Sequence, residues 1–514
     1  MRELPIGWIN IELNAVAQII RGVTYKREQS INESKEGFLP ILRATNITGI
    51  SLTFDDLVYV PAENILTEQL LLQGDVVIAS SSGSKEIVGK AGSFLGGGFI
   101  GSFGAFCTGL RPSTFVVSSY FRYYFQTPSY RKSVSELSAG SNINNLKIGN
   151  LAAQQFPLPP AAEQTRIVEK LEELLSDLDA GVAELKAAQK KLAQYRQSLL
   201  KAAVEGTLTA EWRAKNPPTE TGAQLLERIL IERRARWEAK QLAKFKEQDK
   251  TPPNDWQNKY PEPVHPDTRD LPELPDGWVW SMLGECFKIA IGSTPSRKEI
   301  AYWNGPISWV SSGEVRFNRV RETKEKITEF GLENSSTQIN PVGSVLLGMI
   351  GEGKTRGQVA ILDIPAANNQ NSAAIWVSET PILPEYVYYW LWSQYEQTRR
   401  GSSGNNQPAL NKFIIERILI PLPPVAEMQE VVQLLDDCFE QIMWQEATID
   451  YSSKQSTAQR QNILRAAFSG QLVPQDPNDE PASVLLERIR NERQNAQKNQ
   501  TERTRRRAVK DASQ

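Results

Sequence analysis

Two short motifs have the residue types and spacing of chemically active sites. Residues 348–355 read Gly-Met-Ile-Gly-Glu-Gly-Lys-Thr and fit the GxxxxGK[ST] pattern, in which amides at the start of a helix hold nucleotide phosphates. Residues 356–365 read as a turn and a strand instead of a helix. We therefore expect a hairpin with Lys354 and Arg356 projecting from its tip, and no ATP site.

The second motif, Asn216-Pro-Pro-Thr219, is similar to the Asn-Pro-Pro-aromatic motif of adenine methyltransferases. There the aromatic side chain stacks on a flipped base. Here the fourth residue is Thr219, and no glycine-rich cofactor loop precedes it. His265 is the only histidine, which removes most histidine-based metal sites and triads. The sequence therefore predicts no catalytic residue, no metal site and no cofactor in this chain.

Polar side chains in loops between apolar runs suit a different chemistry. Arg, Lys, Asn, Ser and Thr are residue types that hydrogen-bond to base edges and phosphates. We predict DNA contacts from Arg43, Thr45, Asn46, Ser80, Ser81, Ser82, Lys85, Lys90, Ser293, Thr294, Ser296, Arg297, Ser311, Ser312, Glu314, Lys354 and Arg356.

A repeated stretch must position these loops. Residues 158–208 begin Leu-Pro-Pro-Ala-Ala-Glu and end Gly206-Thr-Leu, and residues 422–472 begin Leu-Pro-Pro-Val-Ala-Glu and end Gly470-Gln-Leu. The offset is 264 residues at both ends, because 422 − 158 and 470 − 206 give the same value. Pro-Pro can start a helix and Gly can end one. We expect two long helices.

Apolar residues in the first helix recur at steps of four and three, which is a heptad seam and includes Gly181, Ala188 and Tyr195. A helix over residues 161–205 is roughly 65 Å long at about 1.5 Å per residue, so it needs a partner helix. We expect the two helices to pair antiparallel. The residues predicted to build this pair and to bind other subunits are Ile167, Leu171, Leu174, Leu178, Leu185, Leu192, Leu199, Val431, Leu435, Ile442, Ile449 and Ile463.

The segments before the two helices also repeat. Leu4-Pro-Ile-Gly-Trp8 returns as Leu274-Pro-Asp-Gly-Trp278, and each segment alternates short apolar runs with Gly/Ser turns. We predict two small α/β domains dominated by strands, each with one helix, near residues 120–136 and 385–398. The predicted segments are domain 1 (1–157), the first helix (158–208), an annex helix and Pro-rich linker (209–272), domain 2 (273–421), the second helix (422–472), and an annex helix with a basic tail (473–514).

Composition agrees with a multidomain protein that contacts other molecules through local patches. The 514 residues carry a net charge of −2, with 40% hydrophobic and 23% charged residues. The three cysteines form no CxxC pair, and the sequence shows no signal peptide or long apolar run, so we expect reducing cytoplasm.

This layout resembles the DNA specificity subunit of Type I restriction-modification systems. The resemblance rests on the Leu-Pro-Asp-Gly-Trp motif, on Pro157-Leu-Pro-Pro160 with Glu163 and Gln164, on Pro421-Leu-Pro-Pro424 with Glu427, on residues 351–360 and on the helix ends.

The resemblance implies that two target recognition domains each read half of a bipartite target in double-stranded DNA. It also implies that the paired helices bind two methyltransferase (modification) subunits and that motor-nuclease (restriction) subunits join them. S-adenosylmethionine, ATP and Mg²⁺ are then expected in the partner subunits. Residues 86–106 show no counterpart of the hairpin at 351–360.

Two other classes of function remain open at this stage. One is a nucleotide-binding enzyme that uses residues 348–355, for which ATP turnover by the pure chain would be diagnostic. The other is a coiled-coil adaptor that binds only proteins, in which case no complex containing the chain selects a DNA sequence.

Overall fold

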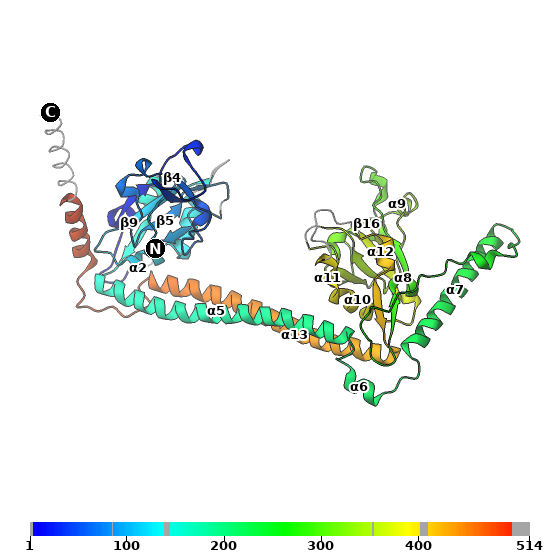
Figure 1. Cartoon of the computed structure of the whole chain (residues 1–514). Helices are drawn as coiled ribbons and strands as arrows, with labels where there is room; N and C mark the ends of the chain where they lie inside the picture. The colour runs from blue at the N-terminus through cyan, green and yellow to red at the C-terminus, as the bar shows by residue number, and fades with distance from the viewer. Residues whose placement is uncertain (1–3, 85, 138–143, 352–353, 401–409, 496–514) are drawn as a thin grey trace. The chain divides into compact units, whose positions relative to one another are not determined.

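The computed structural model describes residues 4–84, 86–137, 144–351, 354–400 and 410–495, and both Lys85 and the basic tail at 503–510 lie outside them. Contacts divide the chain into two compact units. Unit 1 comprises residues 1–186 with 450–514, and unit 2 comprises residues 187–449. Each unit contains one strand-rich domain and parts of two long helices, α5 and α13 (Figure 1). The predicted helical segments 158–208 and 422–472 are therefore each shared between units.

The domain of unit 1 contains two sheets around a buried central strand. One sheet has the antiparallel order β2-β9-β5-β7, and the other has the order β4-β3-β8 with β8 parallel to β3. In β5, Val76 and Ile78 pack beneath the helices, whereas Val77 packs toward the second sheet. The strands are β2 (Ala17–Arg21), β3 (Phe38–Leu42), β4 (Val58–Pro61), β5 (Val76–Ala79), β7 (Ala91–Ser93), β8 (Ser102–Phe103) and β9 (Cys107–Pro112).

The domain of unit 2 has the same plan. Its sheets have the orders β13-β20-β17-β18-β15 and β16-β14-β19, and β19 is parallel to β14 as β8 is to β3. Apolar runs again supply the central strand, because all four residues of β17 are buried. The strands are β13 (Lys288–Ile291), β14 (Trp303–Val310), β15 (Asn318–Val320), β16 (Glu325–Ile327), β17 (Val345–Gly348), β18 (Val359–Leu362), β19 (Ala367–Asn368) and β20 (Ser372–Trp376).

The two domains share one strand order, to which unit 2 adds β15 at the edge of its main sheet, and this corrects one sequence expectation. The hairpin β17–β18 has its counterpart in β5–β7, since both pairs are antiparallel and occupy the same place in their sheets. The expectation that residues 86–106 lack such a hairpin is therefore wrong. The match is invisible in the sequence because burial and sheet position, rather than particular side chains, define these strands.

Helices cover one face of each main sheet, and here too the sequence prediction needs correction. Each predicted single helix is two helices. They are α2 (Ser118–Tyr124) and α3 (Pro128–Leu137) in unit 1, and α10 (Pro384–Ser393) and α11 (Tyr395–Arg400) in unit 2. In unit 1 the hydroxyl of Thr127 accepts the amide of Tyr130 at 3.3 Å, just before Pro128. A capping Thr followed by Pro starts a new helix, because Pro at the first helical position loses no hydrogen bond.

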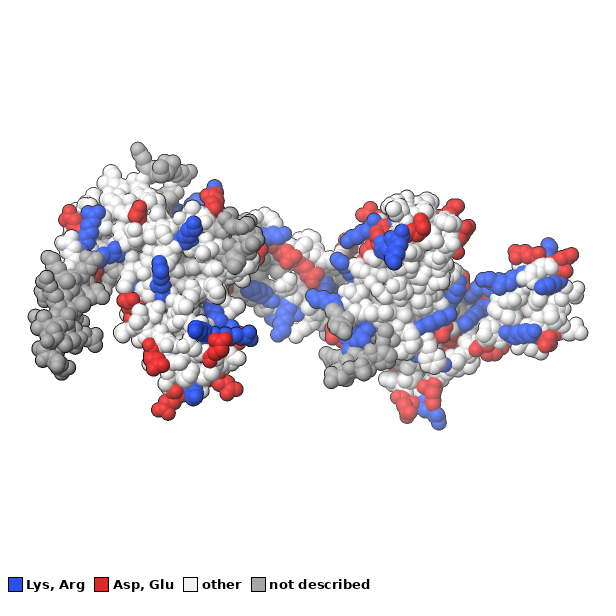
Figure 2. Space-filling model, turned by 90° about the horizontal axis from the view of Figure 1, so that it is seen from above, with Lys and Arg blue, Asp and Glu red and all other residues white. Residues whose placement is uncertain are grey.

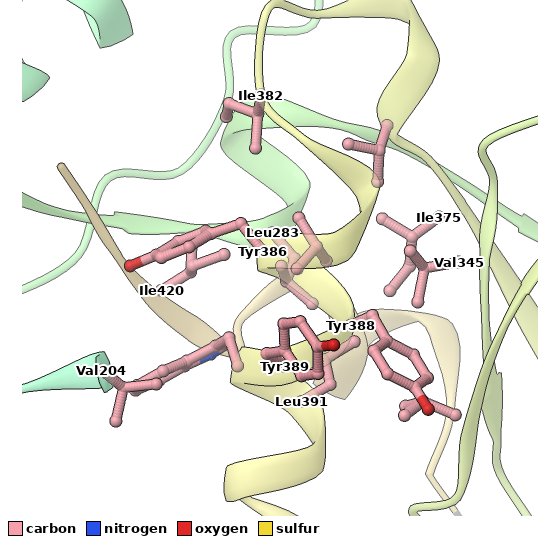
Figure 3. Packing of buried hydrophobic residues seen from close by; sticks show 14 of the residues in the cluster. Val204, Leu283, Val345, Ile375, Ile382, Tyr386, Tyr388, Tyr389, Leu391 and Ile420 are labelled. Carbon is pink, nitrogen blue, oxygen red and sulfur yellow. The ribbon is translucent and has the colours of Figure 1, made fainter. Parts of the chain in front are cut away.

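The core of unit 2 forms around α10. Tyr386 and Leu391 lie among buried residues that include Val345, Ile375 and Ile420 (Figure 3). The hydroxyl of Tyr386 donates to the carbonyl of Pro421 at 2.7 Å, so this buried phenol is satisfied. Burial raises the pKa of Tyr386 well above its ordinary value, which keeps the phenol neutral.

The two long helices are confirmed as α5 (Ala161–Val204) and α13 (Val425–Ala467). In unit 1 the beginning of α5 packs with the end of α13, and Arg460 pairs with Asp179 at 2.6 Å. In unit 2 the end of α5 packs with the beginning of α13, and Arg196 pairs with Glu446 at 2.9 Å. The helices are therefore antiparallel within each unit.

The residues of α5 that are buried are not the same as the residues of the predicted heptad seam. Val168, Leu175 and Leu200 are buried although they lie off the predicted seam, and Tyr195 on the seam is 52% exposed. Near its two ends the helix packs against domain residues as well as against α13. A second apolar face is needed there, so the sequence pattern of one seam was incomplete.

A buried glutamate at the start of each long helix explains the repeated motifs. In unit 1, Glu163 accepts the indole N–H of Trp8 at 2.9 Å and the amide of Gln475 at 3.2 Å. In unit 2, Glu427 accepts the indole N–H of Trp278 at 2.9 Å. Each Leu-Pro-x-Gly-Trp motif therefore joins a domain to a long helix, with a strand pair beside it: β1 (Ile9–Glu12) with β11 (Gln155–Leu158), and β12 (Val279–Met282) with β21 (Leu419–Leu422).

The joint in unit 2 holds additional polar groups. Glu427 also accepts the hydroxyl of Thr209 at 2.7 Å and Nε of Arg213 at 3.1 Å. Both residues follow the end of α5 and lie at or in the short helix α6 (Ala210–Lys215). Thus the end of one long helix and the start of the other meet the domain at the same carboxylate.

The annex helices dock alike. They are α7 (Gly222–Glu247) and the helix at residues 482–495. The amide of Gly222 donates to the Gly277 carbonyl at 2.7 Å, and the amide of Ala482 donates to the Gly7 carbonyl at 2.9 Å. Beyond the domain, Trp256 of the predicted linker stacks on Trp237 of α7 with ring centroids 5.9 Å apart. Part of that linker is therefore folded against the helix.

The remaining helices are short: α1 (Leu13–Val16), α4 (Ile148–Ala152), α8 (Leu283–Cys286), α9 (Glu329–Glu333) and α12 (Lys412–Glu416). Two short strands, β6 (Ser81–Ser82) and β10 (Asn144–Asn145), pair antiparallel in unit 1. Over the residues that the structure describes, no helix combines the length and apolar character needed to cross a bilayer.

Candidate nucleic-acid interface

A loop follows the central strand in both domains, and we call it the reading loop because the sequence predicts DNA contacts in it. In unit 1 it comprises residues 80–84 and 86–90, and in unit 2 it comprises residues 349–351 and 354–358. The amide of Ser80 donates to the Phe106 carbonyl at 2.8 Å, and the amide of Met349 donates to the Asn371 carbonyl at 2.8 Å. The two loops therefore leave their sheets with the same backbone geometry.

Each reading loop contacts the segment that leads to the last short helix of its domain. In unit 1 the amide of Leu146 donates to the Ser80 carbonyl at 2.8 Å. In unit 2 the amide of Leu410 donates to the Met349 carbonyl at 3.2 Å. The predicted contact residues Ser80, Ser81, Ser82 and Lys90 gather in the first loop, and Lys354 and Arg356 gather in the second.

Within these loops the predicted residues differ in availability. Ser80 is 7% exposed, and its hydroxyl lies 2.5 Å from that of Thr108, so it serves the core. Ser81 and Ser82 are half-buried and pair through their backbone with β10. Lys354 is exposed, whereas Lys90 and Arg356 are half-buried.

Two of the three predicted residues after β3 bond to other groups of the same local segment. Asn46 is 3% exposed, and its side chain accepts the amide of Arg43 at 2.9 Å and donates to the Asp55 carbonyl at 2.8 Å. Arg43 pairs with Asp56 at 2.7 Å, while Thr45 is exposed. Asn46 therefore organises this turn, and Thr45 is the freest of the three side chains.

In unit 2, Arg297 is held by two neighbours. It forms hydrogen bonds to Glu325, and its guanidinium lies 3.9 Å from the ring centroid of Trp303. The hydrogen bonds from Arg297 lower the pKa of Glu325. The nearby Ser296 is exposed.

The other predicted residues of unit 2 occupy neighbouring turns. The Thr294 hydroxyl donates to Gln370 at 2.5 Å, and the Ser311 hydroxyl donates to Glu314 at 2.8 Å. Ser312 accepts the side-chain amide of Asn369 at 3.4 Å. Because Gln370 and Asn369 precede Asn371, these turns connect to the base of the reading loop, while Ser293 is half-buried beside them.

Sequence reasoning missed residues that contact the reading loops. Phe106, which is 69% exposed, and Asn371 are equivalent, because each accepts the first amide of its reading loop. Arg131 of α3 and Tyr395 of α11 donate to carbonyls of the loops. Phe106 was identifiable from its Gly-Ala-Phe turn only after the strands on either side were known. Arg131 and Tyr395 carried no sequence signal, because their partners are distant backbone atoms.

On the surface shown in Figure 2, Lys and Arg side chains are interspersed with Asp and Glu. Several arginines among the described residues lie in ion pairs, such as Arg319 with Asp363 at 2.7 Å. Local groups such as those of the reading loops are therefore better candidates for a contact with a polyanion than this face as a whole.

The helix residues predicted to bind other subunits fall into two groups. The fully buried ones are engaged inside the chain: Ile167, Leu171, Leu199, Val431, Leu435 and Ile442. The half-buried ones keep part of their surface exposed: Leu174, Leu178, Leu185, Leu192, Ile449 and Ile463. In unit 2 a groove of about 410 Å³ adjoins Leu192 and Ile449 and is also lined by Tyr195 and the 71% exposed Trp444.

No helix directly follows the described residues of the nucleotide-binding motif, 348–351 and 354–355. After Thr355 the chain turns into β18, as the sequence predicted, instead of entering a helix. Among the residues described, no three His, Cys, Asp or Glu side chains are placed to hold a metal ion.

Comparison with known proteins identifies a family that matches this chain and several proteins that are similar to it. The family described as the Type I restriction modification DNA specificity domain matches residues 5–187 and 275–450. The EcoKI specificity subunit of Escherichia coli (strain K12) is 42% identical over 234 residues, which are 45% of this chain and 50% of that protein. The StySPI specificity subunit of Salmonella potsdam is 43% identical over 211 residues, 41% of this chain and 45% of that protein. These alignments span about half the length of each relative.

More distant similarities extend over nearly the whole chain. The EcoDI specificity subunit of Escherichia coli is 22% identical over 505 residues, which are 96% of each protein. A chain in a solved structure of the type I R-M system superimposes with a TM-score of 0.64 at 16% identity, covering 92% of this chain and 100% of that chain. That similarity shows a shared fold. Because the family match covers more than half of its residues, this chain belongs to the Type I restriction modification DNA specificity domain family.

Proposed function

We propose that the chain is the specificity subunit of a Type I restriction-modification complex and reads a bipartite target in double-stranded DNA. The observation that carries this proposal is the pairing of one strand frame with two different reading loops. The loops share their backbone anchors, yet one holds Ser81 and Ser82 where the other holds Ile350 and Gly351. One scaffold with two unlike surfaces is suited to two unlike half-sites.

Reading relies on side chains that reach base edges. Lys354 and Arg356 can donate to guanine or phosphate, and Ser81, Ser82 and Thr45 can donate to or accept from several bases. The joints around Glu163 and Glu427 have a different role, since they fix each domain to the long helices. Base selection and domain placement therefore depend on separate residues.

Assembly is the second part of the proposal. Two modification subunits bind the paired helices through their half-buried apolar residues, and in unit 2 the groove beside Trp444 offers an apolar seat for a helix. Restriction subunits join to complete the complex. The chain itself is non-catalytic, and S-adenosylmethionine, ATP and Mg²⁺ bind to the partners, which act in the cytoplasm.

Methylation mapping tests this proposal. The chain is expressed with its modification subunits in cells that lack other DNA methylases, and methylated adenines are mapped genome-wide. The expected result is one motif of two short specific parts separated by unread base pairs. A contiguous motif, or methylation without sequence preference, would refute the proposal, and the second result would support a protein-binding adaptor.

The absence of catalysis has its own test. The purified chain, incubated with DNA and labelled S-adenosylmethionine, should transfer no methyl groups, and with ATP it should release no phosphate. Activity that persists after complete removal of the partner subunits would contradict the assignment of catalysis to them.

A further inference from the structure

The two reading loops close in the same way at their far ends. In unit 1 the amide of Gly89 donates to the Ala79 carbonyl at 2.8 Å, and in unit 2 the amide of Gly357 donates to the Gly348 carbonyl at 2.8 Å. Gly89 has φ +75° and Gly357 has φ +83°, a region that favours glycine. Each loop therefore returns to its sheet through a glycine turn of the same kind.

Each glycine turn also lies against the second covering helix of its domain. A Cβ on Gly89 would lie 2.1 Å from Cγ1 of Val134 in α3. A Cβ on Gly357 would lie 3.2 Å from Cδ2 of Tyr395 in α11. The helix and the loop are thus in close contact at the same point of both domains.

From these helices, different side chains hold the loop backbone. In unit 1, Arg131 donates from Nη1 to the Val88 carbonyl and from Nη2 to the Glu86 carbonyl, both at 3.3 Å. In unit 2, the hydroxyl of Tyr395 donates to the Lys354 carbonyl at 2.8 Å. An arginine in one domain and a tyrosine in the other therefore hold equivalent loops.

We propose that Arg131 and Tyr395 are positioning residues that set the selectivity of the reading loops, each for one half-site only. This inference rests on the proposed function and adds that residues behind the DNA-facing surface control base selection. Tyr395 fixes the backbone of Lys354, a residue that we expect to meet DNA. Arg131 fixes the carbonyls on either side of Ile87, in the middle of the first loop.

The physical reason is that base recognition needs a loop held within a fraction of an ångström. When a carbonyl loses its donor it can bind water instead, so the loop samples more conformations. The share of molecules that hold the reading conformation falls, and apparent selectivity falls with it. Neither side chain needs to touch a base for this to occur.

Tyr395→Phe is the sharpest test, because it removes the hydroxyl and keeps the ring, which packs edge-on against Phe317 at 5.0 Å. Binding is measured with the complete complex of chain and modification subunits, on duplex pairs that differ by one base pair within one half-site. Selectivity is the ratio of the two Kd values. We expect it to fall roughly five-fold at one half-site, the effect of one neutral hydrogen bond.

Arg131→Lys tests the other loop, because lysine keeps the charge but cannot bind both carbonyls in the arginine's fork geometry. Selectivity should fall roughly ten-fold, and at the half-site that Tyr395→Phe leaves unchanged. Lys132→Gln in α3 and Gln397→Ala in α11 alter exposed neighbours and serve as matched controls with wild-type selectivity. The unfolding midpoint of Tyr395→Phe should equal that of the wild type.

The outcomes separate this inference from the proposed function. Wild-type selectivity at both half-sites in both variants would overturn the positioning role, and so would an equal loss at both half-sites in either variant. A wild-type complex that discriminates at neither half-site would refute the proposed function instead.

Discussion

The joints of the two units perform one task with different chemistry. In unit 1, Glu163 is met by two neutral donors, the indole of Trp8 and the amide of Gln475. In unit 2, Glu427 is met by the indole of Trp278, a hydroxyl and the guanidinium of Arg213. The indole contact is 2.9 Å in both, so the geometry is shared while the charge balance is not.

This difference shows which parts of the repeat are tied to structure. The tryptophan and glutamate recur because each needs the other when buried. Their remaining partners vary, because any donor that reaches the carboxylate satisfies it. The reading loops vary further still, since only their backbone anchors are shared. Side chains that face the solvent are free to differ between the two domains.

The largest expected effect is at the charged joint. Glu427→Ala leaves Arg213, Thr209 and Trp278 without their acceptor, and breaking a buried charged pair costs about 3–5 kcal/mol. Glu163→Ala leaves only neutral donors unpaired and should cost about 1–3 kcal/mol. Opening of each unit can be followed by alkylation of its buried cysteine, Cys107 in unit 1 and Cys286 in unit 2.

Glu427→Ala should accelerate alkylation of Cys286 and leave that of Cys107 near the wild-type rate, and Glu163→Ala should do the reverse more weakly. If the two variants accelerate alkylation of their respective cysteines equally, the charge of Arg213 adds nothing to the stability of the joint. Acceleration at both cysteines in each variant would show that the units do not open separately.

Replacing the glycine at the end of either long helix should destabilise the two units by a similar amount. Gly206 and Gly470 both have φ +69°, and a Cβ would lie 2.6 Å from Cγ of Pro275 and 2.2 Å from Cγ of Pro5, respectively. Alanine at either position should cost about 2 kcal/mol, from the left-handed conformation and the proline contact together. Denaturant unfolding of Gly206→Ala and Gly470→Ala, with Gly181→Ala as the matched control in open space, measures this.

The groove at Tyr195 and Trp444 has no aromatic counterpart residues in unit 1, so a change there should affect the binding of one modification subunit only. The positions equivalent to Tyr195 and Trp444 are Gln459 and Ala180, because 195 + 264 is 459 and 444 − 264 is 180. Trp444→Ala should weaken binding of one modification subunit by about 2 kcal/mol, as for an aromatic anchor, and leave the unfolding of the chain unchanged. Titration followed by native mass spectrometry counts the bound subunits, and full retention of both at limiting concentration would exclude the groove as a seat.

The smallest effect near neutral pH concerns thiol ionisation, and it should be the same in both units. Burial raises the pKa of the Cys107 thiol to about 12 and that of Cys286 to about 12. The unfolded chain then releases these protons at lower pH than the folded chain, so stability falls as pH rises above the ordinary thiol pKa toward 12. Cys107→Ser and Cys286→Ser should each remove the share of this alkaline loss that comes from one thiol, as unfolding measured between pH 8 and 11 will show.

The long helices, the twofold repeat and the strand-rich domains followed from the sequence, because each depends on local periodicity or on identical residues such as the Leu-Pro-x-Gly-Trp motif. The break between α2 and α3 was missed, although Thr127 and Pro128 carry a cap signal. The burial of Leu175 and Leu200 was missed because it depends on what the helix packs against. Asn46 illustrates the same limit, since its type suits a base contact but its two backbone partners engage it in the fold.

The central claim is that each unit reads its own half-site, and exchanging one domain tests it most directly. Residues 287–417, which lie between α8 and β21, are replaced with the corresponding segment of another specificity subunit whose motif is known, and the joint at Glu427 is kept. Methylation mapping should then show one half-site replaced by that of the donor, with the other half-site unchanged. A motif that changes in both halves, or in neither while methylation continues, would contradict the account.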